Sequence, residues 1–198
     1  MFVCFGSANA TILNFDDLES LSGDDNQLFH TYTKDGYTLS ADLYSPADGT
    51  VYSPEDFLVH TISCCDYQGS AAIEAQGAGT TTTLKRTDGG TFNLNSMDLS
   101  SVTLDYWGTP PALEYAFIGT LLGGGTISQT FTVDHGFQTA NFTGFTNVTQ
   151  VQWGRYLLNA PQIDNINVST VPLPASFWLM GTGLLGLVRA KERNRKTA

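Results

Sequence analysis

Charged residues are scarce in this sequence of 198 residues: they make up 14% of it, against about a quarter in ordinary soluble domains. Basic residues are especially scarce before the C-terminal end, because five of the nine lie in the last ten positions. The segment from Thr11 to Thr170 holds four basic residues against eighteen acidic ones. Such an acidic surface repels nucleic-acid phosphates, which excludes DNA and RNA as partners.

Cysteine is rarer still, with three residues in the sequence. Cys4 lies near the start of the chain, and Cys64 and Cys65 are adjacent. This arrangement gives neither a spaced disulfide framework nor a CxxC metal pair. Two interpretations of the adjacent pair stay open: a strained vicinal disulfide, or two free thiols in or beside a strand.

The sequence also lacks the common catalytic motifs. Its three histidines occur in no HxxxH or HExxH spacing, and no GxSxG is present. Gly123-Gly124-Gly125 is not followed by the Lys-Ser or Lys-Thr of a phosphate-binding loop, and a flexible hairpin explains it better. We therefore expect a protein that is not an enzyme. A glycoside hydrolase is a distant alternative, and it would need two carboxyl groups about 5–10 Å apart in a cleft.

No stretch shows a convincing helical period of 3.6 residues, whereas alternation of apolar and polar residues recurs along the chain. Turn dipeptides such as Asp35-Gly36 and His135-Gly136 separate the alternating segments. We expect about ten short strands and an all-β fold, an antiparallel β-sandwich or jelly roll spanning residues 11–170. The clearest alternating segments are residues 37–43, 57–61, 102–106, 127–133 and 162–168, and residues 92–99 are expected to lead into a strand at Ser101.

The first ten residues, MFVCFGSANA, end in a motif typical of signal-peptidase cleavage. Ala8 and Ala10 occupy the two small-residue positions of an A-x-A site. The apolar piece before them is short, and no basic residue precedes it, so we interpret residues 1–10 as the remnant of a signal peptide whose start is missing or is placed too late. The alternative is an ordinary N-terminal strand.

The C-terminal 28 residues contain three parts in order. A proline-stiffened motif comes first, an apolar run over residues 177–188 follows, and a basic end closes the chain. Prolines keep a motif extended, so that an enzyme can bind it as a strand. An apolar run partitions into a bilayer, and a basic end stays on its cytoplasmic side.

This layout resembles the PEP-CTERM sorting signal, in its VPLPA-CTERM form. The motif residues are Val171, Pro172, Leu173, Pro174 and Ala175, with Leu173 in place of the usual Glu. The resemblance implies processing by an exosortase-type enzyme in a Gram-negative, exopolysaccharide-producing bacterium. It also implies export to the cell surface or extracellular matrix.

The hydrophobic segment is short for a permanent membrane anchor. Residues 175–188 would form a helix about 21 Å long at 1.5 Å per residue, against a hydrocarbon core of about 30 Å. We expect a short C-terminal hydrophobic helix that holds the protein in the inner membrane only transiently, until cleavage. An ordinary C-terminal anchor is the alternative.

The body is similar to galactose-binding-like jelly rolls and to some carbohydrate-binding modules. Short segments carry this resemblance: residues 14–18, 92–99, 142–153 and 163–168. Some folds of this kind bind a structural calcium where the first and last strands meet. The resemblance therefore suggests a calcium site at Asp16, Asp17 and Asp164, and we expect no other cofactor. The alternative makes these aspartates turn and strand-end residues.

Aromatic residues are the better lead to a ligand. Sugar rings need an aromatic face with polar neighbours, because their C–H faces are apolar and their edges polar. Trp107 and Trp153, with Tyr106, Tyr115 and Tyr156, are candidates for such a stacking platform; the alternative places them in the core. We predict a non-enzymatic surface or matrix protein. Exopolysaccharide binding is one role, and a structural or adhesive role without a dedicated ligand is the alternative.

Overall fold

A computed structural model describes residues 9–19, 28–44, 51–61, 67, 69–76, 79–101, 112–154 and 161–171. Contacts divide the chain into two units, of which Ala10–Thr170 contains nearly all the described residues. Several predictions concern residues outside these ranges, among them the strand at 102–106, the helix at 175–188 and the two interpretations of Cys64 and Cys65. Within the described ranges, no helix is long and apolar enough to span a membrane.

The described residues form an all-β fold, as predicted, with one short 3₁₀ helix, η1 (Asp16–Leu18). All the strand pairings are antiparallel. The strands in these ranges are β1 (Ala10–Leu13), β2 (Leu28–Phe29), β3 (Thr31–Lys34), β4 (Tyr37–Tyr44), β5 (Val51–Glu55), β6 (Phe57–His60), β7 (Ala72–Ala75), β8 (Thr80–Arg86), β9 (Phe92–Ser101), β10 (Leu113–Leu121), β11 (Thr126–Val133), β12 (Gln138–Asn141), β13 (Val148–Gly154) and β14 (Pro161–Thr170).

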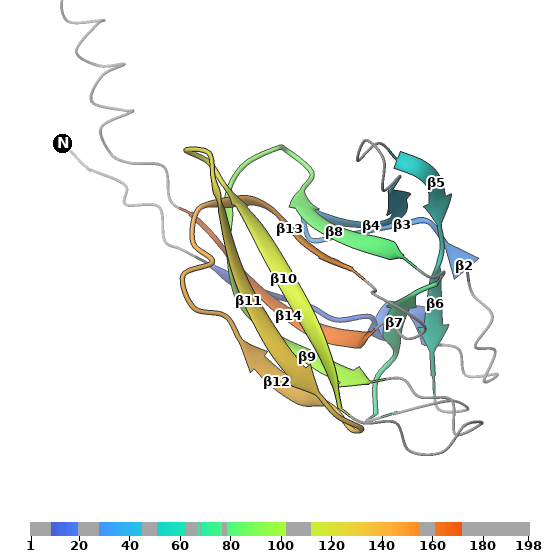
Figure 1. Ribbon diagram of the computed structural model, residues 1–198. Coiled ribbons are helices and arrows are strands. Elements are labelled where there is room, and N and C mark those ends of the chain that lie inside the picture. The colour runs from blue at the N-terminus through green and yellow to red at the C-terminus, as the bar shows by residue number, and fades with distance from the viewer. Residues whose placement is uncertain are drawn as a thin grey trace, which may run out of the picture. The chain divides into compact units, whose positions relative to one another are not determined.

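The strands form two layers of a sandwich (Figure 1). One layer runs β2-β6-β7-β14-β9, with β12 on β9 and β1 on β14. The other contains β11-β10-β13-β8-β4, and β3 and β5 both pair with β4. A single pair, Val148 with Phe92, links β13 to β9 where one layer passes into the other.

The core lies between the layers and is rich in aromatic rings. Tyr37 of β4 meets Phe92 of β9 edge-on, with ring centroids 5.5 Å apart. Phe117 of β10 contacts Phe131 and Phe142 in the same way, at 5.7 and 5.1 Å. Burying such large side chains supplies the main favourable free energy of folding.

The turn between β3 and β4 follows the sequence prediction closely. Asp35 and Gly36 have φ angles of 49° and 80°. Positive φ at both central residues is what a tight hairpin turn of the favoured hand needs, and Asp-Gly accepts it readily. The turn sets the register of the hairpin, in which Lys34 faces Tyr37.

The prediction for residues 92–99 was wrong in one respect: the strand begins at Phe92, not near Ser101. Inward-facing residues do not alternate strictly here, because both Leu94 and Met97 are buried. The opposite strand, β14, shifts register between Asp164 and Val168, where Asn165 has a φ of 48°. This irregularity breaks the period-two pattern in both strands. The alternation in the sequence therefore did not predict that β9 begins at Phe92.

Candidate functional site

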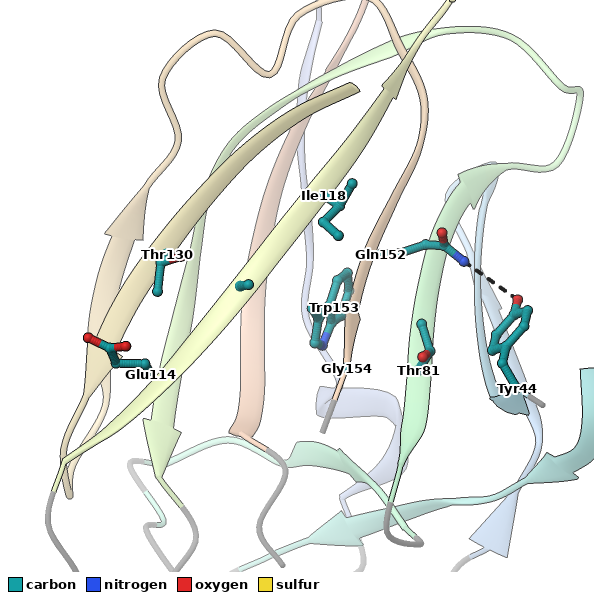
Figure 2. Close-up of a pocket in the computed structure, with 9 residues that line it drawn as sticks. Tyr44, Thr81, Glu114, Ile118, Thr130, Gln152, Trp153 and Gly154 are labelled. Carbon is teal, nitrogen blue, oxygen red and sulfur yellow. Dashed lines mark hydrogen bonds between the residues drawn. The ribbon is translucent and has the colours of Figure 1, made fainter. Parts of the chain in front are cut away.

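An open groove lies on the outer face of the layer formed by β10, β13, β8 and β4, with a volume of about 660 Å³. Figure 2 shows Glu114 and Thr130 at one end of the groove and Tyr44 at the other, with Ile118 and Gln152 between them. We call this site the groove. The described residues that line it are Tyr44, Thr81, Glu114, Ala116, Ile118, Thr130, Gln152, Trp153 and Gly154.

Strand register explains why these residues share a face. Ile118 of β10 lies opposite Gln152 of β13, and Gln152 lies opposite Thr83 of β8. Directly opposed residues in an antiparallel ladder point to the same side of the sheet. Their sequence neighbours point to the other side, so Phe117 and Trp153 face the core.

The polar groups of the groove are held in place by one another. Nε2 of Gln152 donates to Oη of Tyr44 at 3.5 Å and to Oγ1 of Thr83 at 3.1 Å. Oε1 of Gln152 accepts from Nε2 of Gln150 at 3.4 Å. The amide of Gln152 is therefore oriented before any ligand arrives, and it helps to orient the half-buried Tyr44.

The groove also offers apolar surface in the middle of the polar groups. Ile118 is 44% exposed there, and the neighbouring Ala116 is exposed as well. Exposed hydrophobic surface beside oriented hydrogen-bonding groups is typical of ligand sites. Glu114 is the one acid among the described lining residues, so these residues do not supply the carboxyl pair of a glycoside hydrolase.

Only part of the aromatic platform predicted from the sequence lies within the described residues. Trp107, Tyr106 and Tyr156 lie outside the described residues. Trp153 and Tyr115 are buried, with exposed fractions of 3% and 4%, so the expectation that they form an open face was wrong.

The burial of Trp153 has a clear cause in the core. Its ring packs against Phe117 with centroids 5.4 Å apart. Trp153 borders the groove, but its ring packs in the core. The ring of Trp153 therefore presents no open aromatic face.

Sequence analysis did not identify Tyr44 or Gln152 as candidate site residues. They are 108 positions apart, and only the pairing of β13 with β8 and of β8 with β4 brings them together. One signal was available in the sequence. Ile118 falls on the polar side of an alternating strand, where an apolar residue is out of place.

The three aspartates predicted to bind calcium have other partners. Oδ1 of Asp17 accepts from Nζ of Lys34 and from Oη of Tyr32, each at 2.7 Å. Burial raises the pKa of Asp17, but these hydrogen bonds outweigh it, and the net pKa lies below its ordinary value. Asp17 therefore anchors η1 to β3.

Asp164 lies on β14, in a buried position. Its Oδ2 accepts from Oγ of Ser70 at 2.6 Å, and its Oδ1 accepts from the backbone N–H of Asn165 at 2.7 Å. Burial raises the pKa of Asp164; the hydrogen bond from Ser70 opposes this, and the charges of Asp16 and Asp98 add to the rise.

Asp16 is thus near enough to Asp164 to affect its pKa, yet the described residues contain no cluster of three or more acidic, histidine or cysteine side chains that could hold a metal. Asp16, Asp17 and Asp164 are not assembled into a ligand set. The carboxylates of Asp17 and Asp164 are instead engaged by hydrogen bonds from other groups of the protein.

The predicted processing sites lie at the edges of the described residues. Ala10 is exposed and opens β1, where it faces Ser169 of β14. Val171 follows β14 directly. Ala8 and residues 172–175 lie outside the described residues, so the signal cleavage and sorting motif stay predictions in structural terms.

The fold is similar to that of several solved structures at low identity. A variant of the family 29 carbohydrate-binding module CBM29-2 is 13% identical, with a TM-score of 0.40, over 83% of this chain and 92% of that one. A second variant, complexed with mannohexaose, has the same identity and TM-score over 83% and 94%. Tailspike protein 4 of bacteriophage CBA120 is 12% identical, with a TM-score of 0.28, over 75% of this chain and 20% of that one.

No curated protein matches this sequence. One protein family does: residues 170–194 match the PEP-CTERM protein-sorting motif. The match covers the proline motif, the apolar run and most of the basic end, which confirms the resemblance on which the sequence analysis relied. The chain therefore carries a PEP-CTERM sorting signal, which marks an exported protein that an exosortase sorts to the cell surface.

Proposed function

We propose that this exported protein is a non-enzymatic carbohydrate-binding component of the extracellular matrix, and that the groove binds exopolysaccharide. In this proposal the sorting signal is of the VPLPA type and is cleaved by an exosortase in a Gram-negative host. Residues 175–188 hold the precursor in the inner membrane until that cleavage. The mature body, residues 11–170, is then displayed among the glycans that the cell secretes.

The observation that carries this proposal is the combination of surfaces in the groove. Exposed apolar surface on Ile118 lies beside the oriented amide of Gln152 and the ring and hydroxyl of Tyr44. A sugar presents apolar C–H groups on its faces and hydroxyls along its edges. The groove therefore offers both kinds of contact that a sugar chain needs.

The negative charge of the body indicates which class of glycan we expect the groove to bind. Glu114 lines the groove, and no Lys or Arg is among the described lining residues. The segment from Thr11 to Thr170 carries four basic residues against eighteen acidic ones. Polymers rich in uronic acid or sulfate would meet repulsion there, so a neutral polysaccharide is the expected ligand.

The experiment is a binding assay with the full chain in a detergent that has no sugar headgroup. The probes are the host's own exopolysaccharide, a neutral glucan and a uronic-acid polymer. We expect binding to a neutral glycan and a loss of about tenfold or more in affinity, or roughly 1.4 kcal/mol, for Tyr44→Ala or Gln152→Ala. Gln138→Ala, on exposed β12, is the matched control and should leave affinity unchanged.

The alternative is a structural or adhesive matrix protein with no dedicated ligand. The burial of Trp153 and Tyr115 favours it, because these rings stabilise the core rather than a binding face. No binding to any of the three polymers would support this alternative. Binding that is equal in the wild type and in both groove variants would place the glycan elsewhere and would contradict the groove proposal.

A further inference from the structure

Strand β11 forms an open edge of its layer. It pairs with β10 over its whole length, from Thr126 opposite Thr120 to Val133 opposite Leu113, and with no other described strand. In an antiparallel pair, every second residue directs its backbone N–H and C=O away from the partner. β11 therefore has a row of backbone donors and acceptors on its outer side that no described strand pairs with.

This edge lacks the protection that the other edge strands of the described ranges have. β1, β3 and β12 are four residues long, β2 is two, and β5 is five, whereas β11 has eight. β3 ends in Lys34, and β5 contains Pro54 next to Glu55. Short length, lysine and proline are the usual devices that prevent an edge from pairing with another chain. β11 has none of them.

The edge is also free of charge in a strongly acidic chain. No charged residue occurs between Glu114 and Asp134, although the whole sequence has a formal net charge of −10. Two copies that approach along β11 would therefore meet without like-charge repulsion on the pairing strands. Elsewhere on the acidic surface, two copies would repel each other.

We propose that β11 pairs antiparallel with β11 of a second copy, about a two-fold axis at Gln129. In this register Ser128 faces Thr130 of the second copy, and Ile127 faces Phe131 of the second copy. A two-fold interface must be self-complementary, and an alternating strand paired with itself in this register meets that condition. Hydroxyl-bearing residues oppose one another on one face, and on the other face the two Ile127–Phe131 pairs flank the two Gln129 residues at the axis.

The side chains of β11 already fit this arrangement. Gln129 turns inward, where its Nε2 donates to the carbonyl of Asn141 at 3.1 Å and its Oε1 accepts from the N–H of Thr143 at 3.0 Å. Its amide is thus engaged within its own protomer. Ser128 and Thr130 are exposed on the opposite face.

Pairing would place two grooves on one continuous sheet, because Thr130 belongs to both the edge and the groove lining. Two sites on one rigid body bind a repeating polymer more tightly than one site does. The dimer itself does not rest on the proposed function, since it follows from the edge alone.

The test measures the mass of the full chain by light scattering in detergent, over a range of protein concentrations. We expect a concentration-dependent dimer in the wild type and a monomer for Ser128→Lys, which adds a charge at the pairing edge. Thr31→Lys adds the same charge to an exposed position of β3 and should still dimerise. A monomeric wild type, or a Ser128→Lys variant that still dimerises, would overturn the proposal.

Amide hydrogen exchange gives a second readout that separates pairing through β11 from association through the hydrophobic tail. Amides of β11 that face away from β10 should exchange more slowly as the wild-type concentration rises. The amides of β3 should show no such dependence. Association with unchanged exchange in β11 would assign the contact to another part of the chain and would also overturn the proposal.

Discussion

The two layers of the sandwich both carry polar residues on the side facing away from the core, but they use them differently. On β10, β13, β8 and β4 these residues line the open groove. On β6, β7, β14 and β9 several of them are buried and most of those are bonded to nearby polar groups: His60 contacts Glu74 at 2.9 Å, and Asp164 accepts from Ser70. Polar alternation in a strand therefore does not by itself distinguish a binding face from a structural one.

The two faces differ in which side chains are exposed and free to contact a ligand. Asp98 accepts from Thr139 at 2.6 Å and from Nδ2 of Asn165 at 3.1 Å, so the polar groups of the β9–β14 face largely satisfy each other. Glu114 and Ile118 in the groove are exposed instead. Substitutions on the β9–β14 face should change stability, and substitutions in the groove should change binding.

The largest effect is expected in the core that supports both faces. Phe117 is fully buried and contacts Phe131, Phe142 and Trp153. Phe117→Ala should lower the free energy of unfolding by about 3–5 kcal/mol, because it removes apolar burial and leaves a cavity. Chemical denaturation measures this loss. A loss below about 1 kcal/mol would show that the two layers do not pack around this ring.

A matched pair of glutamates compares the two faces directly. Glu74→Ala should cost about 1–3 kcal/mol of stability, because it leaves buried His60 without its partner. Glu114→Ala removes an exposed carboxylate from the groove and should change stability by less than about 0.5 kcal/mol. Equal effects of the two substitutions on unfolding would contradict the assignment of one face to structure and the other to binding.

A matched pair of glutamines sharpens the same comparison. The amide of Gln162 is fully buried and makes no hydrogen bond with the part of the chain that the structure describes, which costs free energy. Gln162→Met keeps the shape of the side chain and should stabilise the fold by about 1 kcal/mol. Gln152→Met should leave stability nearly unchanged and lower glycan affinity. Thermal and chemical unfolding of both variants, with the binding assay, separate these outcomes.

The smallest effect is a change of stability with pH at Asp164. Burial raises its pKa above the ordinary value of 3.8, so the neutral carboxyl is the form that the folded state favours. This stabilisation is complete below 3.8 and is lost as pH rises through the raised pKa. Asn stays neutral throughout, so the stability of Asp164→Asn relative to the wild type should rise with pH across that window. Denaturation at acidic and neutral pH checks the sign; a relative stability that falls with pH would contradict it.

Several parts of this architecture could be predicted from residue patterns. Strict alternation indicated β4 and β11, and Asp35-Gly36 indicated the turn before β4. Both are local features, since they depend on neighbouring residues alone. The tail was equally accessible, because its order of motif, apolar run and basic end is linear in the sequence and matches the PEP-CTERM motif.

The groove could not be predicted in the same way. Tyr44 and Gln152 meet only because β8 lies between β4 and β13, and no local pattern specifies that strand order. Trp153 was chosen for its chemistry, but the parity of β13 turns its ring to the core. The aspartates were grouped by the expected proximity of two strands, whereas in the structure Asp17 accepts a hydrogen bond from Lys34 and Asp164 accepts one from Ser70.

The most direct test of the central claim is to map, by NMR chemical-shift changes, where a neutral oligosaccharide derived from the host's exopolysaccharide binds to the full chain. The account predicts that the largest changes fall on Tyr44, Thr81, Ile118 and Gln152, around the groove. Changes centred on His60, Glu74 and Asp164 would contradict it, because they would assign binding to the face that we interpret as structural.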